Sequence, residues 1–419
     1  MKVMVIGSGG REHSIVKKLK QNKTIEQLFV LPGNGGIQKD AVCVNVGAKD
    51  IDKIVEFAKE NGIDFAVVAP DDPLVLGCVD ALEKIGVQCF GPNKNAAIIE
   101  GSKSFAKELM KKYSIPTAKY EVFSEIEKAL EYLETQNFPI VIKADGLALG
   151  KGVIIATTKQ EAVDAVKSMM LGGKFGLSGA KVVIEEFLQG PEVSVLSFTD
   201  GNVVVPMVSS MDFKRAHDND EGLNTGGMGS IAPNPFYTEE VAKECYDKIF
   251  LPTIKAMNAE KRTFKGCLYF GLMLTKDGPK VIEYNCRFGD PETQVVLELL
   301  ESDLFEIMKA TANGTLADTQ VKFSKQSACC VVVASNGYPE KYETGFEISF
   351  EDGVEEKTIF AGVKIVNGKL VNSGGRVLGV VETASTLKQA VEKAYVLANK
   401  VKFENAYFRK DIGKKAIKE

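Results

Sequence analysis

The first hundred residues alternate between short apolar runs and segments of helical spacing, and this order limits the fold more than any other feature. The apolar run Val3–Ile6 ends in the glycine-rich stretch Gly7–Gly10, and apolar residues then recur at helical spacing over 12–20. Further apolar runs and helical patterns follow in turn, the runs at 28–31, 64–69 and 88–90 and the patterns at 50–60 and 74–85. This alternation predicts a parallel α/β unit that binds its ligand at the carboxyl ends of the strands.

The rest of the chain has the pattern of an α+β module followed by a small α/β tail. We expect strands at 119–123, 139–142, 181–184, 192–198, 268–274 and 280–285, helices at 102–112, 124–136, 159–171 and 238–257, and a polar loop at 212–230. After a break within 313–326, three strand-like segments precede an amphipathic helix over 386–400. A length of 419 residues fits several domains. We therefore predict an α/β and α+β multidomain protein, with a Rossmann-like domain at 1–101, a middle domain at 102–325 and a small C-terminal α/β domain at 326–419.

The composition excludes several classes of function. The chain has 52 Lys and Arg against 56 Asp and Glu, a net charge of −4, which is too balanced for electrostatic capture of nucleic acid or of a membrane surface. Its eight cysteines form no C-x-x-C pair, and no apolar run is long enough to span a membrane, so we expect a cytoplasmic protein with reduced thiols. With only two histidines, a zinc site or a histidine-based triad is disfavoured, and any bound metal should have oxygen ligands.

The stretch Gly7–Gly10 lies between a predicted strand and a predicted helix. Backbone N–H groups in such a loop point at a ligand above the sheet, which suits a phosphate. The dinucleotide fingerprint requires a third glycine where this chain has Glu12, and that carboxylate would repel a pyrophosphate. A nicotinamide-dependent enzyme is therefore disfavoured, whereas a monophosphate ligand or a plain tight turn both fit.

A second glycine-rich loop, Gly146–Gly152, joins strand to strand and lacks the order of a Walker loop. Lys143 and Lys151 are placed to neutralise phosphate oxygens, although two solvated lysines beside a hairpin would look the same in sequence. We expect this hairpin to close over a nucleotide. We also expect Lys143→Ala to leave the melting temperature nearly unchanged, because the charge would serve the phosphate rather than the fold.

Two polar segments further along the chain could also contact a ligand. The segment 185–188 follows an apolar run, where its backbone could meet an adenine edge and its carboxylates could hold ribose hydroxyls; a bare acidic strand end is the alternative. Asn224–Gly229 has three glycines in six residues and several charged residues before it. Ordering such a loop costs conformational entropy, which favours a loop that binds a ligand. Flexible polar loops without a ligand also have this composition.

Glu283 and Asn285 end a predicted strand and, being two residues apart, face the same side. A carboxylate beside an amide oxygen suits Mg²⁺, which takes its other ligands from water and nucleotide phosphates. Arg287 continues this face and could bind a carboxylate or phosphate. The alternative is a polar strand end followed by a helix cap at 290–292.

In their order along the chain these pieces resemble the ATP-grasp ligases. Within that superfamily the sequence closely resembles the phosphoribosylamine–glycine ligases, also called glycinamide ribonucleotide synthetases. The resemblance runs from Met1 to the closing FRKDIG and is carried by MKVMVIGSGGREHSI, PGNGG, EGSKSFAKELM, VIKADGLALGKGV, NTGGMG, VIEYNCRFGDPETQ and NSGGRVL. NTGGMG and NCRFGDPETQ are the most specific of these segments.

The resemblance implies an ATP-grasp fold with a preATP-grasp N-terminal domain and a lid subdomain at about 118–188. It implies an enzyme of purine biosynthesis that joins glycine to 5-phosphoribosylamine through a glycyl phosphate, giving glycinamide ribonucleotide, ADP and phosphate. ATP would be the co-substrate and Mg²⁺ or Mn²⁺ the metal. The expected partners are small molecules only, without nucleic acid or membrane, and the enzyme is expected to be a monomer.

The resemblance also assigns residues to roles, position by position. The residues matching ATP-binding positions are Lys103, Lys143, Lys151, Glu185, Glu186, Phe187, Leu188 and Glu192. Those matching substrate-binding positions are Gly9, Gly10, Arg11, Asn34, Asp71, Asn224, Thr225, Gly226, Gly227, Met228, Gly229, Arg287 and Asp290. Glu283 and Asn285 match the metal ligands, and the catalytic residues implied are Arg287, Lys214 and Lys151.

The sequence departs from the family pattern at three places. Asp71 stands where the family usually has a glutamate, Phe213 where a histidine is common, and 270–272 where many ATP-grasp enzymes have an acidic metal ligand. A base at 213 and the ligands of a second metal are therefore not assigned. Two alternatives stay open: another ATP-grasp carboxylate–amine ligase or carboxylase, and a regulatory nucleotide-binding protein without turnover, which would not need the Glu283–Asn285 pair.

Overall fold

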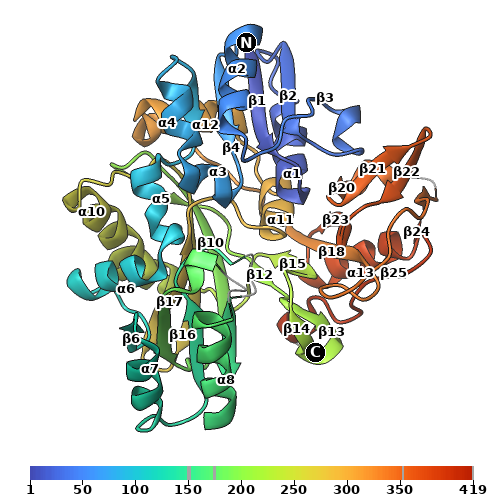
Figure 1. The fold of residues 1–419 in the computed structure, drawn as a ribbon. Helices are drawn as coiled ribbons and strands as arrows, with labels where there is room; N and C mark the ends of the chain where they lie inside the picture. The colour runs from blue at the N-terminus through green and yellow to red at the C-terminus, as the bar shows by residue number, and fades with distance from the viewer. Residues whose placement is uncertain (149–151, 173–175, 352, 418–419) are drawn as a thin grey trace.

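The N-terminal section is a parallel sheet with helices packed against it (Figure 1). The computed structural model describes residues 1–148, 152–172, 176–351 and 353–417. Five parallel strands lie in the order β3-β2-β1-β4-β5, with bounds β1 Lys2–Gly7, β2 Gln27–Pro32, β3 Val42–Cys43, β4 Phe65–Val68 and β5 Gln88–Phe90. The helices of this section are α1 Gly10–Leu19, α2 Ile51–Asn61, α3 Asp71–Leu76, α4 Cys78–Glu83 and α5 Lys94–Gly101.

The predicted parallel sheet is thus present, with one correction to its helices. Strand β4 is fully buried, as expected when helices cover both faces of a parallel sheet. The single helix predicted over 74–85 is two short helices, α3 and α4. Gly77, at φ 95°, separates them because its left-handed conformation ends α3.

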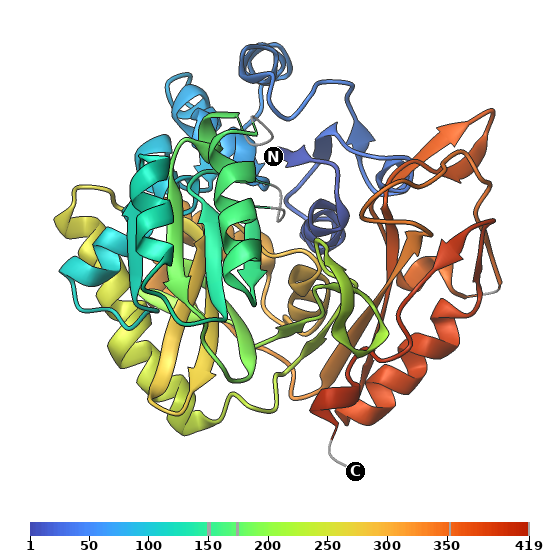
Figure 2. The same cartoon turned by 60° about the horizontal axis from the view of Figure 1, so that its bottom comes forward.

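The middle section contains two antiparallel sheets. The first has the order β6-β9-β7-β8, with β6 Tyr120–Phe123, β7 Ile140–Ala144, β8 Val153–Ala156 and β9 Val182–Glu186, and carries α7 Ile126–Leu133 and α8 Lys159–Met170 on one face (Figure 2). The second has the order β11-β10-β16-β17, with β10 Glu192–Thr199, β11 Val204–Pro206, β16 Gly266–Thr275 and β17 Gly278–Asn285. Helix α6 Lys103–Lys112 enters this section, and α9 Glu239–Cys245 continues through a π-helical turn into α10 Leu251–Ala259.

The polar loop predicted over 212–230 is wrong, because most of it is strand. Its ends form β12 Met211–Asp212 and β15 Gly229–Ala232, and between them lies the hairpin of β13 Arg215–His217 and β14 Glu221–Asn224. β15 pairs with β18 Ser327–Ser335, which continues the sheet to β23 Arg376–Ala384 and β20 Thr358–Phe360. The sheet β12-β15-β18-β23-β20 thus takes strands from both sides of the predicted boundary at 325/326. The domain bounds themselves stay a prediction.

The C-terminal section completes this sheet. Its remaining elements are β19 Ser349–Phe350, β20 Thr358–Phe360, β21 Val363–Val366, β22 Lys369–Asn372, β23 Arg376–Ala384, α13 Leu387–Ala398, β24 Val401–Lys402 and β25 Ala406–Tyr407. Helix α13 packs on β18 and β23. Two further helices, α11 Glu292–Glu298 and α12 Leu304–Asn313, connect the middle section to it.

The N-terminal section shares its core with both of its neighbours. One buried apolar cluster joins residues of β1 and β4 to residues of α10 and β16, and another joins β1 and β2 to α11, α12 and β18. In the described part of the chain, no helix combines the length and the apolar character needed to cross a membrane. The shared cores hold the three sections around a common centre (Figure 1).

Candidate active site

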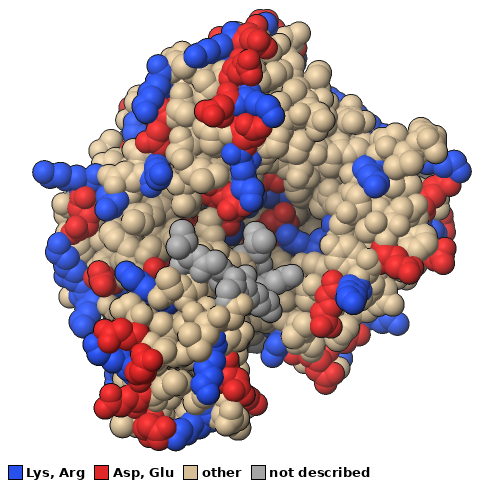
Figure 3. Space-filling view, in the orientation of Figure 1, with Lys and Arg blue, Asp and Glu red and all other residues tan. Residues whose placement is uncertain are grey.

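A cavity of about 890 Å³ lies where the sections meet. Its lining includes residues of both antiparallel sheets, of the start of α3 and of the C-terminal section. The surface around it is deeply hollowed, with acidic and basic side chains inside the hollow (Figure 3). Most of the predicted site residues line it: Arg11, Asp71, Lys103, Lys143, Glu185–Leu188, Glu192, Lys214, Asn224–Gly226, Glu283, Asn285, Arg287 and Asp290.

Lys143, at the end of β7, is part of a buried ion triad. Its Nζ lies 3.0 Å from Oε1 of Glu185, and Nζ of Lys107 lies 2.9 Å from Oε2 of the same carboxylate. None of the three side chains is more than 4% exposed. Burial lowers the pKa of Lys107 to about 8, although Glu185 opposes this. Burial would raise the pKa of Glu185, but Lys143 and Lys107 together outweigh it and hold that pKa below its usual value. The prediction that the charge of Lys143 serves only the phosphate and not the fold is therefore wrong.

Lys103 begins α6 and reaches the second glycine-rich loop. Its Nζ donates to the carbonyl of Gly146 at 2.8 Å, and burial lowers its pKa. Phe187 and Leu188 follow β9 and also line the cavity. Lys151, the other predicted lysine of the loop, lies outside the described residues.

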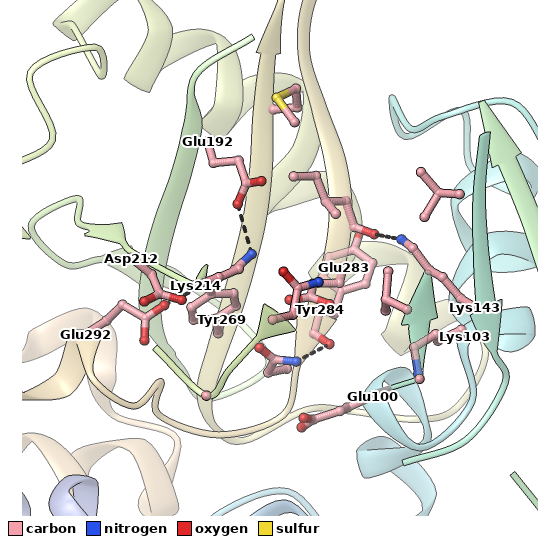
Figure 4. A pocket seen from close by; sticks show the side chains of 18 of the residues that line it. Glu100, Lys103, Lys143, Glu192, Asp212, Lys214, Tyr269, Glu283, Tyr284 and Glu292 are labelled. Carbon is pink, nitrogen blue, oxygen red and sulfur yellow. Dashed lines mark hydrogen bonds and ion pairs between the residues drawn. The ribbon is translucent and has the colours of Figure 1, made fainter. Parts of the chain in front are cut away.

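Glu283 and Asn285 both line the cavity at the end of β17, as the two-residue spacing predicts. The pairing of β16 with β17 shifts register between Gly271 and Leu272, which leaves Ile282 as an extra residue. The carbonyl of Ile282 accepts a 3.0 Å hydrogen bond from Lys143, so the lysine and the Glu283–Asn285 pair are fixed beside each other. Figure 4 shows Lys143 and Lys103 on the side of Glu283 opposite Lys214.

The donor set of Glu283 and Asn285 fits a hard divalent metal. Both side chains have an oxygen that can bind a metal. Among the described residues, no Lys, Arg or His nitrogen lies within 4 Å of the Glu283 carboxylate. Groups of three or more His, Cys, Asp or Glu side chains suited to a metal are absent from the described residues. A metal here would thus need oxygens from a ligand such as a polyphosphate.

Arg287, which also lines the cavity, has the carboxylates of Glu100 and Asp71 near it. Its Nη2 is 3.0 Å from Oε1 of Glu100, whose Oε2 accepts from the backbone N–H of Cys286 at 2.7 Å. Burial raises the pKa of Glu100, with Arg287 opposing. Burial would also raise the pKa of Asp71, but Arg287 and Arg11 outweigh it, so this pKa is lowered. Arg287 therefore serves as a counter-ion, and its Nε has no partner among the described groups.

The first glycine-rich loop is held by the protein's own carboxylates. The N–H of Gly9 donates to Glu12 at 2.6 Å and the N–H of Arg11 donates to Asp290 at 3.3 Å. The side chain of Asn34 donates to the carbonyl of Ser8 and accepts from two backbone N–H groups of its own loop. Gly9, Gly10 and Asn34 are not among the cavity-lining residues. Their predicted contact with substrate stays a prediction, and the structure gives them a role in shaping the loop.

Three family models match the chain in succession. They are the N domain of phosphoribosylglycinamide synthetase over residues 1–100, its ATP-grasp (A) domain over 101–293 and its C domain over 328–415. The phosphoribosylamine–glycine ligase of Clostridium acetobutylicum is 49% identical over 414 residues, covering 99% of this chain and 100% of that protein. The chain belongs to the phosphoribosylglycinamide synthetase family.

Other members of the family match this chain over nearly their full length, in sequence and in structure. The phosphoribosylamine–glycine ligase of Halalkalibacterium halodurans is 49% identical, and the alignment covers 100% of this chain and 98% of that protein. The crystal structure of the Thermotoga maritima ligase superposes with a TM-score of 0.86 at 36% identity, covering 98% of this chain and 100% of that one. A biotin carboxylase of Campylobacter jejuni superposes with a TM-score of 0.75 at 15% identity, and the match covers 97% of this chain and 93% of that one. At this identity the match shows a shared fold only. The predicted resemblance and the ATP-grasp fold are confirmed.

In this synthetase-family chain the NTGGMG loop is fixed by the C-terminal section. Nη1 of Arg376 donates to the carbonyls of Gly226 and Asp290, both at 2.8 Å, and Tyr338 accepts from the N–H of Gly226 at 3.0 Å. Met228 is fully buried and, like Gly227 and Gly229, is not among the cavity-lining residues. Sequence reasoning missed Arg376 as a site residue, although it lies within the segment NSGGRVL that carried the resemblance.

We expect Gly227→Ala to destabilise the protein by about 2 kcal/mol, since it strains this loop. Gly227 has φ 113°, and an added Cβ would clash with Pro291 and lie 2.6 Å from Oδ1 of Asp212. Urea denaturation would measure the loss. Gly47→Ala is the matched control, because a Cβ there meets nothing within 4 Å, and equal effects of the two variants would contradict the prediction.

Three further polar residues that line the cavity, Asp212, Tyr269 and Glu292, were missed by sequence reasoning. Oε1 of Glu292 accepts from the hydroxyl of Tyr269 at 3.0 Å and from that of Ser194 at 3.2 Å. Burial and the nearby Glu292 raise the pKa of Asp212 well above its usual value. Beside them, the predicted site residue Lys214 pairs with Glu192 at 2.9 Å, and this carboxylate raises the pKa of the lysine. Asp212, Tyr269 and Glu292 come from separate segments, so no local sequence pattern could have brought them together.

Proposed function

We propose that this chain is an ATP-dependent ligase that joins glycine to 5-phosphoribosylamine, giving glycinamide ribonucleotide, ADP and phosphate in purine biosynthesis. The observation that carries the proposal is the match over nearly the whole chain, at 49% identity, to proteins named phosphoribosylamine–glycine ligase. The cavity supports it, because lysines suited to phosphates and the Glu283–Asn285 pair line the same space.

ATP would bind between the two antiparallel sheets of the middle section. Lys103 and Lys143 would face its phosphates, residues 186–188 its adenine, and Glu192 its ribose. Glu283 and Asn285 would hold Mg²⁺ or Mn²⁺, which neutralises phosphate charge when bound. Glu185, predicted as an ATP contact, is engaged by Lys107 and Lys143, so we assign it to holding Lys143.

The proposed chemistry has two steps. A carboxylate oxygen of glycine attacks the γ-phosphorus of ATP, the bond to the β–γ bridging oxygen breaks, and ADP leaves. The amine of phosphoribosylamine then attacks the carbonyl carbon of the glycyl phosphate, loses a proton and expels phosphate. Such transfers depend on positioned positive charge and on exclusion of water more than on a base, which suits a cavity without histidine in its lining.

The remaining charged groups would position the two substrates. Arg287 and Lys214 would stabilise negative charge that develops on the transferring groups. Arg11, at the start of α1, would face the phosphate of phosphoribosylamine. Asp71, whose pKa is held low, would accept hydrogen bonds from its ribose hydroxyls.

ATP cleavage should depend on glycine and phosphoribosylamine together, because a glycyl phosphate without its acceptor should stay trapped in the closed site. Assays of ADP and phosphate with each substrate omitted in turn would test this. AMP as a product would contradict the mechanism. Turnover that needs bicarbonate instead of glycine would favour a carboxylase, and absence of any turnover would favour the regulatory alternative.

Two further expectations stay predictions. We expect a monomer, which light scattering of the purified protein would test. We also expect a cytoplasmic location, in keeping with the substrates proposed above.

A further inference from the structure

The closing segment 408–413, FRKDIG, has no part in the function proposed above, yet its Arg409 has the largest side chain that is fully buried in the described residues. Nε and Nη2 of Arg409 donate to the carboxylate of Asp411, both at 2.8 Å. Nη1 donates to the carbonyl of Arg215 at 3.0 Å and to Asp220 at 3.1 Å. Arg409 therefore joins the end of the chain to the hairpin of β13 and β14, which lies beside it (Figure 1).

The tip of this hairpin is held by the same closing segment. The contacts join Asp218 to the backbone N–H of Lys410 at 2.7 Å, the backbone N–H of Asn219 to Asp411 at 2.8 Å, and Asp220 to Lys415 at 3.0 Å. Asn219 and Asp220, at φ 60° and 55°, have a left-handed backbone conformation, which costs free energy in residues other than glycine. The conformation of the tip thus depends on the end of the chain.

The base of the hairpin carries Lys214, which directly precedes β13. The carbonyl of Lys214 accepts from the backbone N–H of Thr225 at 2.7 Å and from its hydroxyl at 2.8 Å, so the two ends of the hairpin are tied together. Nζ of Lys214 pairs with Glu192 at 2.9 Å, and both residues line the cavity. Any movement of the hairpin would therefore move a charged group of the cavity.

Arg409 contacts the neighbours of Lys214 on both sides. On one side it bonds the carbonyl of Arg215, and on the other its guanidinium lies over the ring of Phe213, 5.5 Å from the ring centre. Phe213 is buried, and neither it nor Arg409 is among the cavity-lining residues. Arg409 can therefore affect the cavity only through the residues that it holds.

We propose that Arg409 is a positioning residue, which holds Phe213 and Arg215 and thereby fixes the Nζ of Lys214 in the cavity. The proposal rests on the proposed function, in which Lys214 stabilises negative charge on the transferring groups. Small displacements of such a charge are costly, because its stabilising effect requires that it be in place before the reaction. The alternative is that Arg409 only stabilises the C-terminal section, which would leave the turnover of the folded enzyme unchanged.

Arg409→Met keeps the length of the side chain but removes its charge and donors. It should lower kcat by on the order of 10-fold while the KM for ATP changes less than about 3-fold. Arg409→Lys keeps the charge but cannot bond both carboxylates and the carbonyl, so it should lower kcat by only about 3-fold. An unchanged kcat in both variants, with normal turnover of the wild type, would overturn the proposal and leave the proposed function standing.

Val401→Ala is the control for a loss of stability alone. Val401 is buried in the same C-terminal core, on β24, and does not line the cavity. The substitution should lower the melting temperature because it leaves a cavity in the core, but kcat below the melting temperature should not change. An equal fall of kcat in Val401→Ala and Arg409→Met would assign Arg409 to the fold and overturn the proposal.

A double-mutant cycle with Lys214→Ala tests whether Arg409 acts through this lysine. In the Lys214→Ala background Arg409→Met should change the residual kcat by less than about 2-fold, because the group that it positions is already absent. Arg409→Lys in both backgrounds gives the same test if Arg409→Met does not fold. A loss of kcat that is as large without Lys214 as with it would overturn the proposal.

Hydrogen exchange gives a measure that does not depend on activity. In Arg409→Met the amides of 215–224 should exchange faster than in the wild type, and those of α13 should not. Faster exchange throughout the C-terminal section, without a larger change in the hairpin, would contradict the proposal. A wild type that does not turn over glycine and phosphoribosylamine would contradict the proposed function and the catalytic part of this proposal, whereas the exchange rates would still show whether Arg409 holds the hairpin.

Discussion

Glu283→Gln should lower turnover by on the order of 10²-fold or more, equivalent to about 2.7 kcal/mol of transition-state stabilisation. The substitution keeps the size and hydrogen bonding of the side chain but removes the charge that would hold the metal. Glu283 has no ion-pair partner among the described residues, so the fold should not depend on its charge. Steady-state rates at saturating Mg²⁺, measured beside a thermal melt, test both parts of the expectation.

Asp277→Asn provides the control for this experiment. Asp277 is an exposed carboxylate in the turn that joins β16 to β17, at the opposite end of the same hairpin, and it does not line the cavity. It should retain full activity. A fully active Glu283→Gln enzyme would remove this residue from the site and leave the metal without its charged ligand.

Lys143→Ala should weaken ATP binding and also destabilise the fold, by about 2 kcal/mol. Removing one partner of a buried ion pair costs about 3–5 kcal/mol, but Lys107 remains beside Glu185 and reduces the loss. Urea denaturation and the KM for ATP would measure the two effects. Lys167→Ala, on the exposed face of α8, should change neither.

The double variant Lys143→Ala/Glu185→Gln separates the two roles of Lys143. Neutralising Glu185 removes the uncompensated charge, so much of the stability should return while ATP binding stays weak. If stability does not recover, the ion triad is not the cause of the loss. If ATP binding recovers with stability, Lys143 does not act on the nucleotide.

Local patterns were sufficient for the parallel sheet of the N-terminal section and for placing Glu283 and Asn285 on one side of their strand. The alternation of apolar and helical segments predicts the parallel sheet, and the two-residue spacing of Glu283 and Asn285 places both on the cavity side of β17. Both are properties of neighbouring residues in one element, which a sequence displays directly.

Features that depend on distant partners were not predictable from sequence. The 212–230 segment reads as a polar loop because its strands are short, and β15 is stabilised by β18, about a hundred residues later. The role of Lys143 in the fold depends on Glu185 and Lys107, which no spacing rule brings together. Asp212 and Glu292 look like ordinary polar residues until folding brings them together on the cavity wall.

Asp290 has a consequence for anyone who recombines this chain with its relatives. Its carboxylate accepts from the backbone of Arg11 at the start of α1 and from Gln294 of α11, and it pairs with Arg376 of the C-terminal section. Burial would raise the pKa of Asp290, but Arg376 and Arg11 outweigh it and keep the carboxylate ionised. The three sections are therefore not interchangeable modules. A chimera that takes its first or last section from another species must carry over the residues that meet at this carboxylate as one set.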